Sequence, residues 1–108
     1  MNETAIDPQI EMEFHKAILA RNNGKEGQAR VCARRAAGIA VRGFFEQNNF
    51  PIQNKSVYEL LLSLINRPGI PSIAKQNAIN LTMRVTESFS LPINVDLIEE
   101  ARSLCDQL

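Results

Sequence analysis

The sequence predicts an all-α protein, folded as a compact bundle of about five helices. Apolar residues recur at spacings of three and four in several segments, which is the periodicity of a helix buried on one side. Helix-starting residues and Pro, Gly or Asn breaks separate these segments, and no segment alternates convincingly like a strand. A chain of 108 residues that is 44% hydrophobic has room for one core. We therefore expect a single helical domain over residues 1–108, with 1–7 loosely held.

The first helix is predicted to begin at Pro8. Asp7 is a favoured N-cap, and proline suits the first position of a helix because its missing amide hydrogen is not needed there. Ile10 and Phe14 begin an apolar series at helical spacing. The sequence then predicts a turn over Asn22–Lys25, where asparagines and a glycine interrupt the series.

The second helix is expected from about Glu26 to Asn48, and it is predicted to be long and central. Small residues dominate its predicted inner face and would let a neighbouring helix approach closely. Gly38 and Gly43 each cost about 1 kcal/mol relative to alanine inside a helix, which favours a packing role. Val31 and Phe45 on the polar side predict that other elements cover this helix on several sides. The predicted inner face consists of Ala29, Cys32, Ala33, Ala36, Ala37, Ile39, Ala40, Gly43 and Phe44.

Three shorter helices complete the prediction. Ser56 and Glu59 form a capping box, in which each side chain bonds to the other residue's amide, at the start of a helix from Val57 to Asn66. A rigid Pro-Gly turn then precedes a helix from about Ser72 to Ser88. The inner face predicted for it is Ile70, Ala74, Ala78, Leu81 and Val85. The last helix is expected to start after Asp96 and to reach about Leu108.

Charge is balanced over the whole chain but unevenly spread. The formal net charge is zero, which argues against a general binder of polyanions. Acidic residues dominate 1–20 and 87–108, whereas basic residues dominate 21–42. Two interpretations remain open. The charges pair within the bundle, or a basic face stays open for an anionic ligand.

The remaining composition predicts a cytoplasmic protein without membrane contact. Cys32 and Cys105 are far apart and outside any metal-like cluster, so we expect two free thiols. No secretory signal opens the chain. The apolar runs are far shorter than the roughly 20 residues that a membrane-spanning helix requires.

The chain carries no recognisable catalytic or metal-binding motif. His15 is the only histidine, and no HExxH or CxxC pattern is present, so we expect an exposed helix residue rather than a ligand. The segment Gly24–Gly27 is too short for a phosphate-binding loop. We therefore predict no catalytic residue, no metal and no cofactor.

The arginines of the second helix are the candidate ligand-binding residues. Arg35 and Arg42 share one edge of the helix, and Arg30 and Arg34 share another. Gly38 lies between the edges, which predicts a shallow patch flanked by guanidinium groups that suit phosphate or carboxylate. The alternative is pairing within the bundle, with the partners Glu11, Glu13, Glu99 or Glu100.

The order of these features resembles that of HEPN domains, small helical bundles of prokaryotes that are associated with nucleotide and RNA biology. The resemblance covers about residues 8–108. It rests on Ala33–Arg42 leading into Phe44–Glu46, on the helix beginning Tyr58–Leu62, and on Ile98–Arg102 in the last helix. Ribonucleases of that family carry an arginine shortly before a histidine, but no arginine precedes His15. The resemblance therefore implies no catalytic residue. It implies a bundle that dimerises, with a partner such as a nucleotidyltransferase or a nucleotide-bearing ligand.

Two functions follow as hypotheses. The first is a non-catalytic helical protein that acts through protein association, as a homodimer. The alternative is a module that binds an anion, a nucleotide or RNA through Arg30, Arg34, Arg35, Gly38 and Arg42. An enzyme with an unfamiliar site ranks below both.

Overall fold

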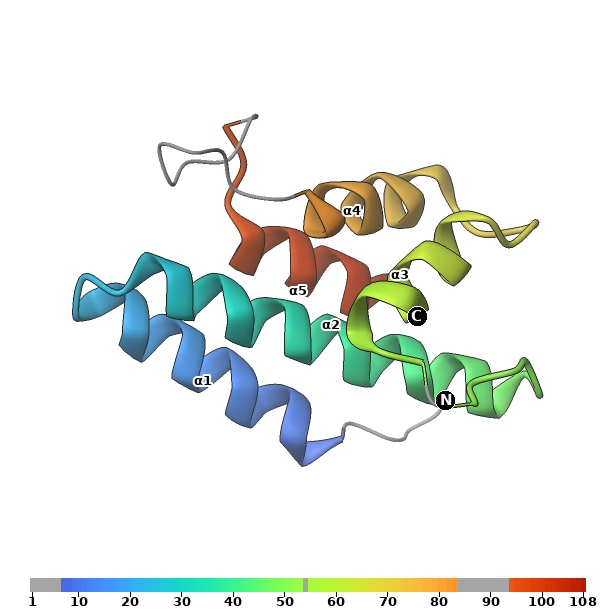
Figure 1. Cartoon of the computed structure of the whole chain (residues 1–108), viewed down its shortest axis with the longest axis horizontal. Coiled ribbons are helices and arrows are strands. Elements are labelled where there is room, and N and C mark those ends of the chain that lie inside the picture. The colour runs from blue at the N-terminus through green and yellow to red at the C-terminus, as the bar shows by residue number, and fades with distance from the viewer. Residues whose placement is uncertain (1–6, 54, 84–93) are drawn as a thin grey trace.

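Five helices follow one another along the chain in the computed structural model, which describes residues 7–53, 55–83 and 94–108 (Figure 1). The predicted all-α fold class is therefore confirmed. The helices are α1 (Pro8–Asn22), α2 (Glu26–Gln47), α3 (Val57–Ile65), α4 (Ser72–Thr82) and α5 (Leu97–Gln107).

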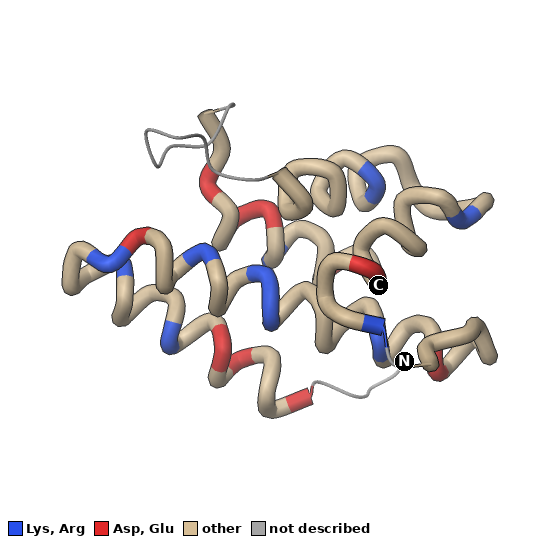
Figure 2. The backbone as a smooth tube through the Cα atoms, viewed as in Figure 1, with Lys and Arg blue, Asp and Glu red and all other residues tan. Residues whose placement is uncertain are grey.

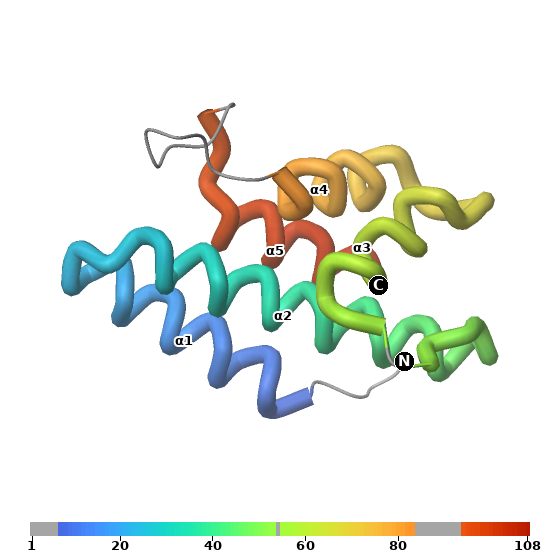
Figure 3. The backbone as a smooth tube through the Cα atoms, in the orientation of Figure 1, coloured from blue at the N-terminus to red at the C-terminus, as the bar shows by residue number. Residues whose placement is uncertain are grey.

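Helix α2 is the longest element and lies at the centre of the arrangement. It packs against α1, α3 and α5, whereas α4 lies on α3 and α5 (Figures 1 and 3). The radius of gyration is 13.5 Å, close to the ~13 Å of a compact domain of this length. The predicted central position of the second helix is thus confirmed.

The predicted caps form where helices α1, α3 and α5 begin. The Asp7 carboxylate accepts from the amide of Gln9 at 2.8 Å. The Glu59 amide donates to Ser56 Oγ at 3.1 Å, and the Ser56 amide donates to Glu59 Oε1 at 2.8 Å, which completes the capping box. Asp96 Oδ1 accepts from the amide of Ile98 at 3.0 Å. These bonds satisfy amides that have no partner inside the helix, so local sequence determines the three starts.

The inner face of α2 was predicted only in part. Ala29, Ala33, Ala36, Ala37 and Cys32 are buried as expected. Phe45 is also fully buried, which confirms that this helix is covered on several sides, although Val31 stays exposed. At four further residues burial is only partial, because they line a hollow of about 290 Å³ with residues of α1 and α5, although Phe44 among them still packs against the core. The four are Ile39, Ala40, Gly43 and Phe44.

Helix α4 ends earlier than predicted. It stops at Thr82, because Met83 adopts an extended conformation with φ −68° and ψ 141°. Arg34 of α2 donates to the carbonyls of Leu81 and Met83, so a distant side chain caps this end. No Gly or Pro in the local sequence signals that cap. The rest of the predicted helix, residues 84–88 with Val85, lies outside the described residues.

Polar side chains join α4 to α5. The side-chain amides of Asn77 and Asn80 both donate to Glu100 Oε1, at 2.9 and 3.0 Å. Both asparagines are only 6% exposed, so the carboxylate satisfies donors that water does not reach. Gln107 adds a bond to Asn77 Oδ1 at 3.0 Å. This interface fixes how the last helix sits on its neighbour.

Candidate functional site

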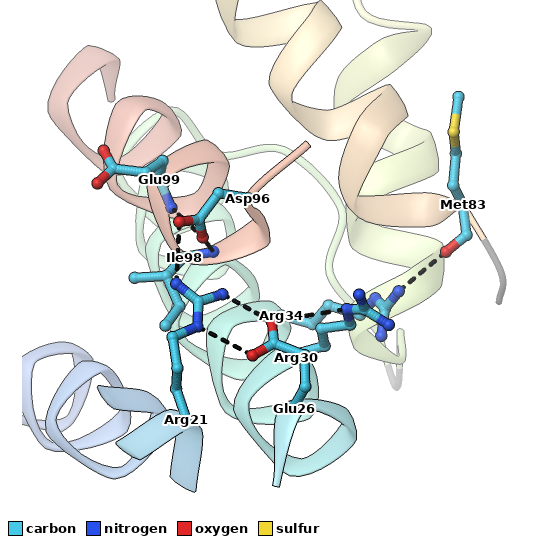
Figure 4. Close-up of polar contacts among 8 residues, drawn as sticks. All are labelled: Arg21, Glu26, Arg30, Arg34, Met83, Asp96, Ile98 and Glu99. Carbon is cyan, nitrogen blue, oxygen red and sulfur yellow. Dashed lines mark hydrogen bonds and ion pairs between the residues drawn. The ribbon is translucent and has the colours of Figure 1, made fainter. Parts of the chain in front are cut away.

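Two of the four candidate arginines of α2 bind backbone carbonyls of other elements. Arg34 donates through Nε to the Leu81 carbonyl at 2.8 Å. It also donates through Nη2 to the Met83 carbonyl at 2.9 Å, as Figure 4 shows. Arg42 donates to the Lys55 carbonyl at 2.9 Å. Both side chains therefore hold the bundle together, one at the end of α4 and one at the segment leading into α3.

The other two arginines of α2 differ in their surroundings. Arg30 Nε lies 3.8 Å from Glu26 Oε2, one helical turn away, in a loose ion pair. Arg35 is exposed and forms no hydrogen bond or ion pair with any residue that the structure describes. None of the four arginines pairs with a carboxylate that was expected as a partner. The predicted pairing with Glu11, Glu13, Glu99 or Glu100 is therefore wrong.

Gly38 does not form the open patch that its position between the arginines predicted. It is buried, and a Cβ placed on it would lie 2.7 Å from Val57 Cγ2 and 3.1 Å from Cγ1. Carbon atoms do not approach that closely, so the missing side chain provides the space in which α3 crosses α2. Gly38 therefore contributes to helix packing, and Val57 covers it.

A cavity of about 280 Å³ lies beside this crossing, and it brings Arg34 and Arg35 together. Apolar side chains from three helices form most of its wall. Val31 and Tyr58 are 38% and 43% exposed, so the apolar wall reaches the surface. Its full lining is Val31, Arg34, Arg35, Val57, Tyr58, Leu61 and Leu81. Arg30, Gly38 and Arg42 do not line it.

No acidic residue lines this cavity, and no described carboxylate forms an ion pair with Arg34. Burial, and then the neighbouring charge of Arg30, lower the pKa of the Arg34 guanidinium below its ordinary value. Burial and a like charge both disfavour the charged form of a guanidinium group. The carbonyl groups that Arg34 binds are neutral, so they do not cancel its charge. The cavity therefore holds positive charge that the described residues do not neutralise. Along the middle of α2, Figure 2 shows basic residues, with acidic residues towards both ends of that helix, on α1 and near the start of α5.

The shortest ion pairs among the described residues lie elsewhere, around Arg21 at the end of α1. Its Nε and Nη2 donate to the Glu26 carboxylate at 2.9 and 2.7 Å, and Nη1 donates to Asp96 Oδ2 at 2.9 Å (Figure 4). Hydrogen bonding from Arg21 lowers the pKa of Glu26. Burial alone would raise the pKa of Asp96, but bonds from Arg21 and the Glu99 and Ile98 amides lower it overall. The cluster ties α1, α2 and α5 together.

Sequence reasoning missed the Arg21 cluster. The available signal was the acidic start of the last helix, but the pairing spans more than seventy residues and no spacing rule predicts it. The planar guanidinium group of an arginine can bind two carboxylates at once, as Arg21 binds those of Glu26 and Asp96. The single ammonium group of a lysine lacks this geometry.

The reactive side chains are dispersed. His15 is exposed on α1, as predicted. Cys32 is buried and Cys105 half-buried, and both are free thiols, also as predicted. Burial, together with the nearby Asp106 and Glu11 carboxylates, raises the pKa of Cys105 to about 11. This thiol therefore stays protonated at neutral pH and is a poor nucleophile.

Over residues 7–53, 55–83 and 94–108, no three His, Cys, Asp or Glu side chains gather where they could hold a metal ion. Within the same ranges, none of the helices combines the length and hydrophobicity that a bilayer crossing requires.

No protein-family model, curated protein or solved structure matches this chain.

Proposed function

We propose that this protein acts by association, as a homodimer that forms through the outer side of α1. The observation that carries the proposal is a set of exposed residues that we call the α1 stripe: Met12, His15, Ile18 and Leu19. Met12 is 57% exposed, Ile18 42% and Leu19 55%. Burying such apolar side chains against a partner lowers the free energy, because it removes apolar surface from water.

The α1 stripe is not a by-product of the way α1 packs. Phe14, Ala17 and Ala20 are the buried residues of α1, and they face the bundle. Met12, His15 and Leu19 follow spacings of three and four on the opposite side of the helix. The outer side of the helix therefore carries three large apolar side chains beside His15, which packing within the bundle does not explain.

Two arguments favour a second copy of this chain as the partner. The formal net charge is zero, so no net repulsion opposes the approach of two identical molecules. A two-fold axis beside α1 would place the α1 stripe of one protomer against the α1 stripe of the other. A two-fold dimer is the commonest symmetric assembly. One helix covers less than the ~800 Å² per partner of a standard interface, so we expect a dissociation constant of about tens of micromolar.

The small residues of α2 do not supply the dimer interface, because Ala29, Ala33 and Ala36 are fully buried within the bundle. They support the bundle itself. The α1 stripe supports association.

Sedimentation equilibrium tests the dimer over protein concentrations from about 5 to 200 µM, a range that spans the expected constant. We expect the wild type to pass from monomer to dimer and Leu19→Lys to stay monomeric, because a buried ammonium group opposes pairing. Ile73→Lys is the matched control, since Ile73 is 63% exposed on α4. It should dimerise like the wild type.

Two results would overturn the proposal. One is a wild type that remains monomeric at the highest concentration. The other is a dimer that Leu19→Lys and Ile73→Lys weaken equally, which would place the interface outside the α1 stripe. Circular dichroism of each variant establishes that the helices are intact.

The HEPN resemblance and a nucleotidyltransferase partner stay predictions. Bundles of five helices serve many functions, so fold alone does not select one. Binding of RNA along α2 has less support than the dimer, because Arg34 and Arg42 are bound to carbonyls and Arg35 alone among the four is open. RNA affinity that falls steeply with salt would favour that alternative.

A further inference from the structure

We propose that the cavity between α2, α3 and α4 binds a small amphiphilic carboxylate, with its apolar chain in the cavity and its carboxylate on Arg35. This site is independent of the dimer proposed above, because none of its lining residues belongs to α1. Its ligand is a molecule with one acidic group and a short, flexible or flat apolar body.

The apolar part of the proposal rests on the wall of the cavity. The accessible hydrocarbon of this wall comes from Val31, Tyr58 and the half-buried Val57, while Leu61 and Leu81 lie fully buried behind it. Ligand sites combine an apolar wall with a few polar groups that fix orientation, and their volumes run from about 300 to 1,000 Å³. At about 280 Å³ this cavity lies just below that range, so we expect a small ligand, roughly the size of octanoate.

The charged part rests on two guanidinium groups. Arg34 is held at the wall by the Leu81 and Met83 carbonyls, which fixes its position without neutralising its charge. Arg35 is adjacent, exposed and unpaired among the described residues. A carboxylate would satisfy the planar fork of Arg35 with two hydrogen bonds and would offset the charge of Arg34.

Nucleic acid fits this cavity less well than a small carboxylate does. A backbone of phosphates needs several cations along a path, but Arg42 and Arg34 are bound to carbonyls and Arg30 is paired with Glu26. The apolar wall of the cavity also contributes nothing to the binding of a phosphate group alone. An apolar wall beside a positive charge favours a ligand with an apolar part and an acidic part.

The test is a titration followed by amide NMR of the intact protein, with octanoate as the probe and with octanol and acetate as the two partial probes. We expect octanoate to shift amides of Val31–Arg35 and Val57–Leu61 with a dissociation constant on the order of 100 µM. Octanol and acetate should each bind at least about tenfold more weakly, because each lacks one of the two interactions. Equal binding of octanol would overturn the role of Arg35.

Two variants locate the site. Arg35→Gln should weaken octanoate binding about tenfold or more, whereas Lys16→Gln, which removes the same charge from exposed α1, should leave it unchanged. Val31→Glu adds a carboxylate at the exposed rim and should abolish binding, and Ile73→Glu on α4 should not. All four substitutions are at exposed residues, so none of them disturbs the core. The proposal is refuted if octanoate causes no shifts at millimolar concentration, or if its shifts lie outside the cavity or survive Val31→Glu.

Discussion

Gly38 and Val57 are in contact where α3 crosses α2, and this contact tolerates no added atom. A Cβ on Gly38 would approach Val57 Cγ2 to 2.7 Å, and a β-branched valine has little rotational freedom with which to withdraw. We expect Gly38→Ala to lower the free energy of unfolding by about 1–2 kcal/mol, measured by urea denaturation. Val57→Ala in the same chain should recover part of that loss.

Gly43 provides the control for Gly38. It lies on the same helix, but a Cβ there would meet no atom within 4 Å. Gly43→Ala should therefore raise stability by up to about 1 kcal/mol, through helix propensity alone. Equal effects of the two substitutions would contradict the packing role of Gly38.

Individual contacts of the candidate site could be predicted only in part. The sequence placed Arg34, Arg35 and Gly38 correctly on α2, because helical periodicity is local. It did not predict that Arg34 caps α4 or that Val57 covers Gly38. Those contacts depend on how α3 and α4 lie against α2, and no spacing within one helix encodes that arrangement.

The Arg21 cluster acts between elements, since it joins the end of α1 to the starts of α2 and α5. Its carboxylates, Glu26 and Asp96, have pKa values below their ordinary range. The folded state therefore binds fewer protons than the unfolded state as the pH falls towards 4, and stability present at neutral pH is lost below that value.

Arg21→Gln tests this dependence. The variant should melt at a lower temperature than the wild type at pH 7, and the difference should be smaller at about pH 3, because below about pH 4 the unfolded wild-type chain binds protons that the ion-paired carboxylates of the folded state exclude. Thermal denaturation followed by circular dichroism measures both values. A difference that stays constant from pH 7 to pH 3 would show that the cluster contributes through packing and not through charge.

Helix boundaries show where local signals suffice. Asp7, Ser56 and Asp96 each cap a helix through their own side chains, and the three starts were predicted correctly. The end of α4 was not, because its cap comes from Arg34 of another helix. The α4–α5 interface was missed for a similar reason. Asn77 and Asn80 look like surface residues until Glu100 is placed opposite them.

The whole molecule presents two surfaces on different sides of α2. The α1 stripe lies on the outside of α1, and the cavity lies among α2, α3 and α4. Figure 1 shows α1 on one side of α2 and α3 and α4 on the other. They share no residue, so we expect little coupling free energy between them. Octanoate should bind the monomeric Leu19→Lys variant with an affinity within about twofold of the wild type, as measured by calorimetry. A larger change would mean that dimerisation reshapes the cavity.

The central place of α2 also has a consequence for synthesis on the ribosome. Helices α1 and α2 can pair as soon as both have emerged, but the side of α2 that receives α5 stays uncovered until Leu97–Gln107 have been made. Nascent chains with exposed apolar surface are prone to aggregate. Half of the buried residues of α2 are alanines, which expose little apolar area while they wait. The alanine-rich face of α2 therefore limits the aggregation of the nascent chain before α5 has been made.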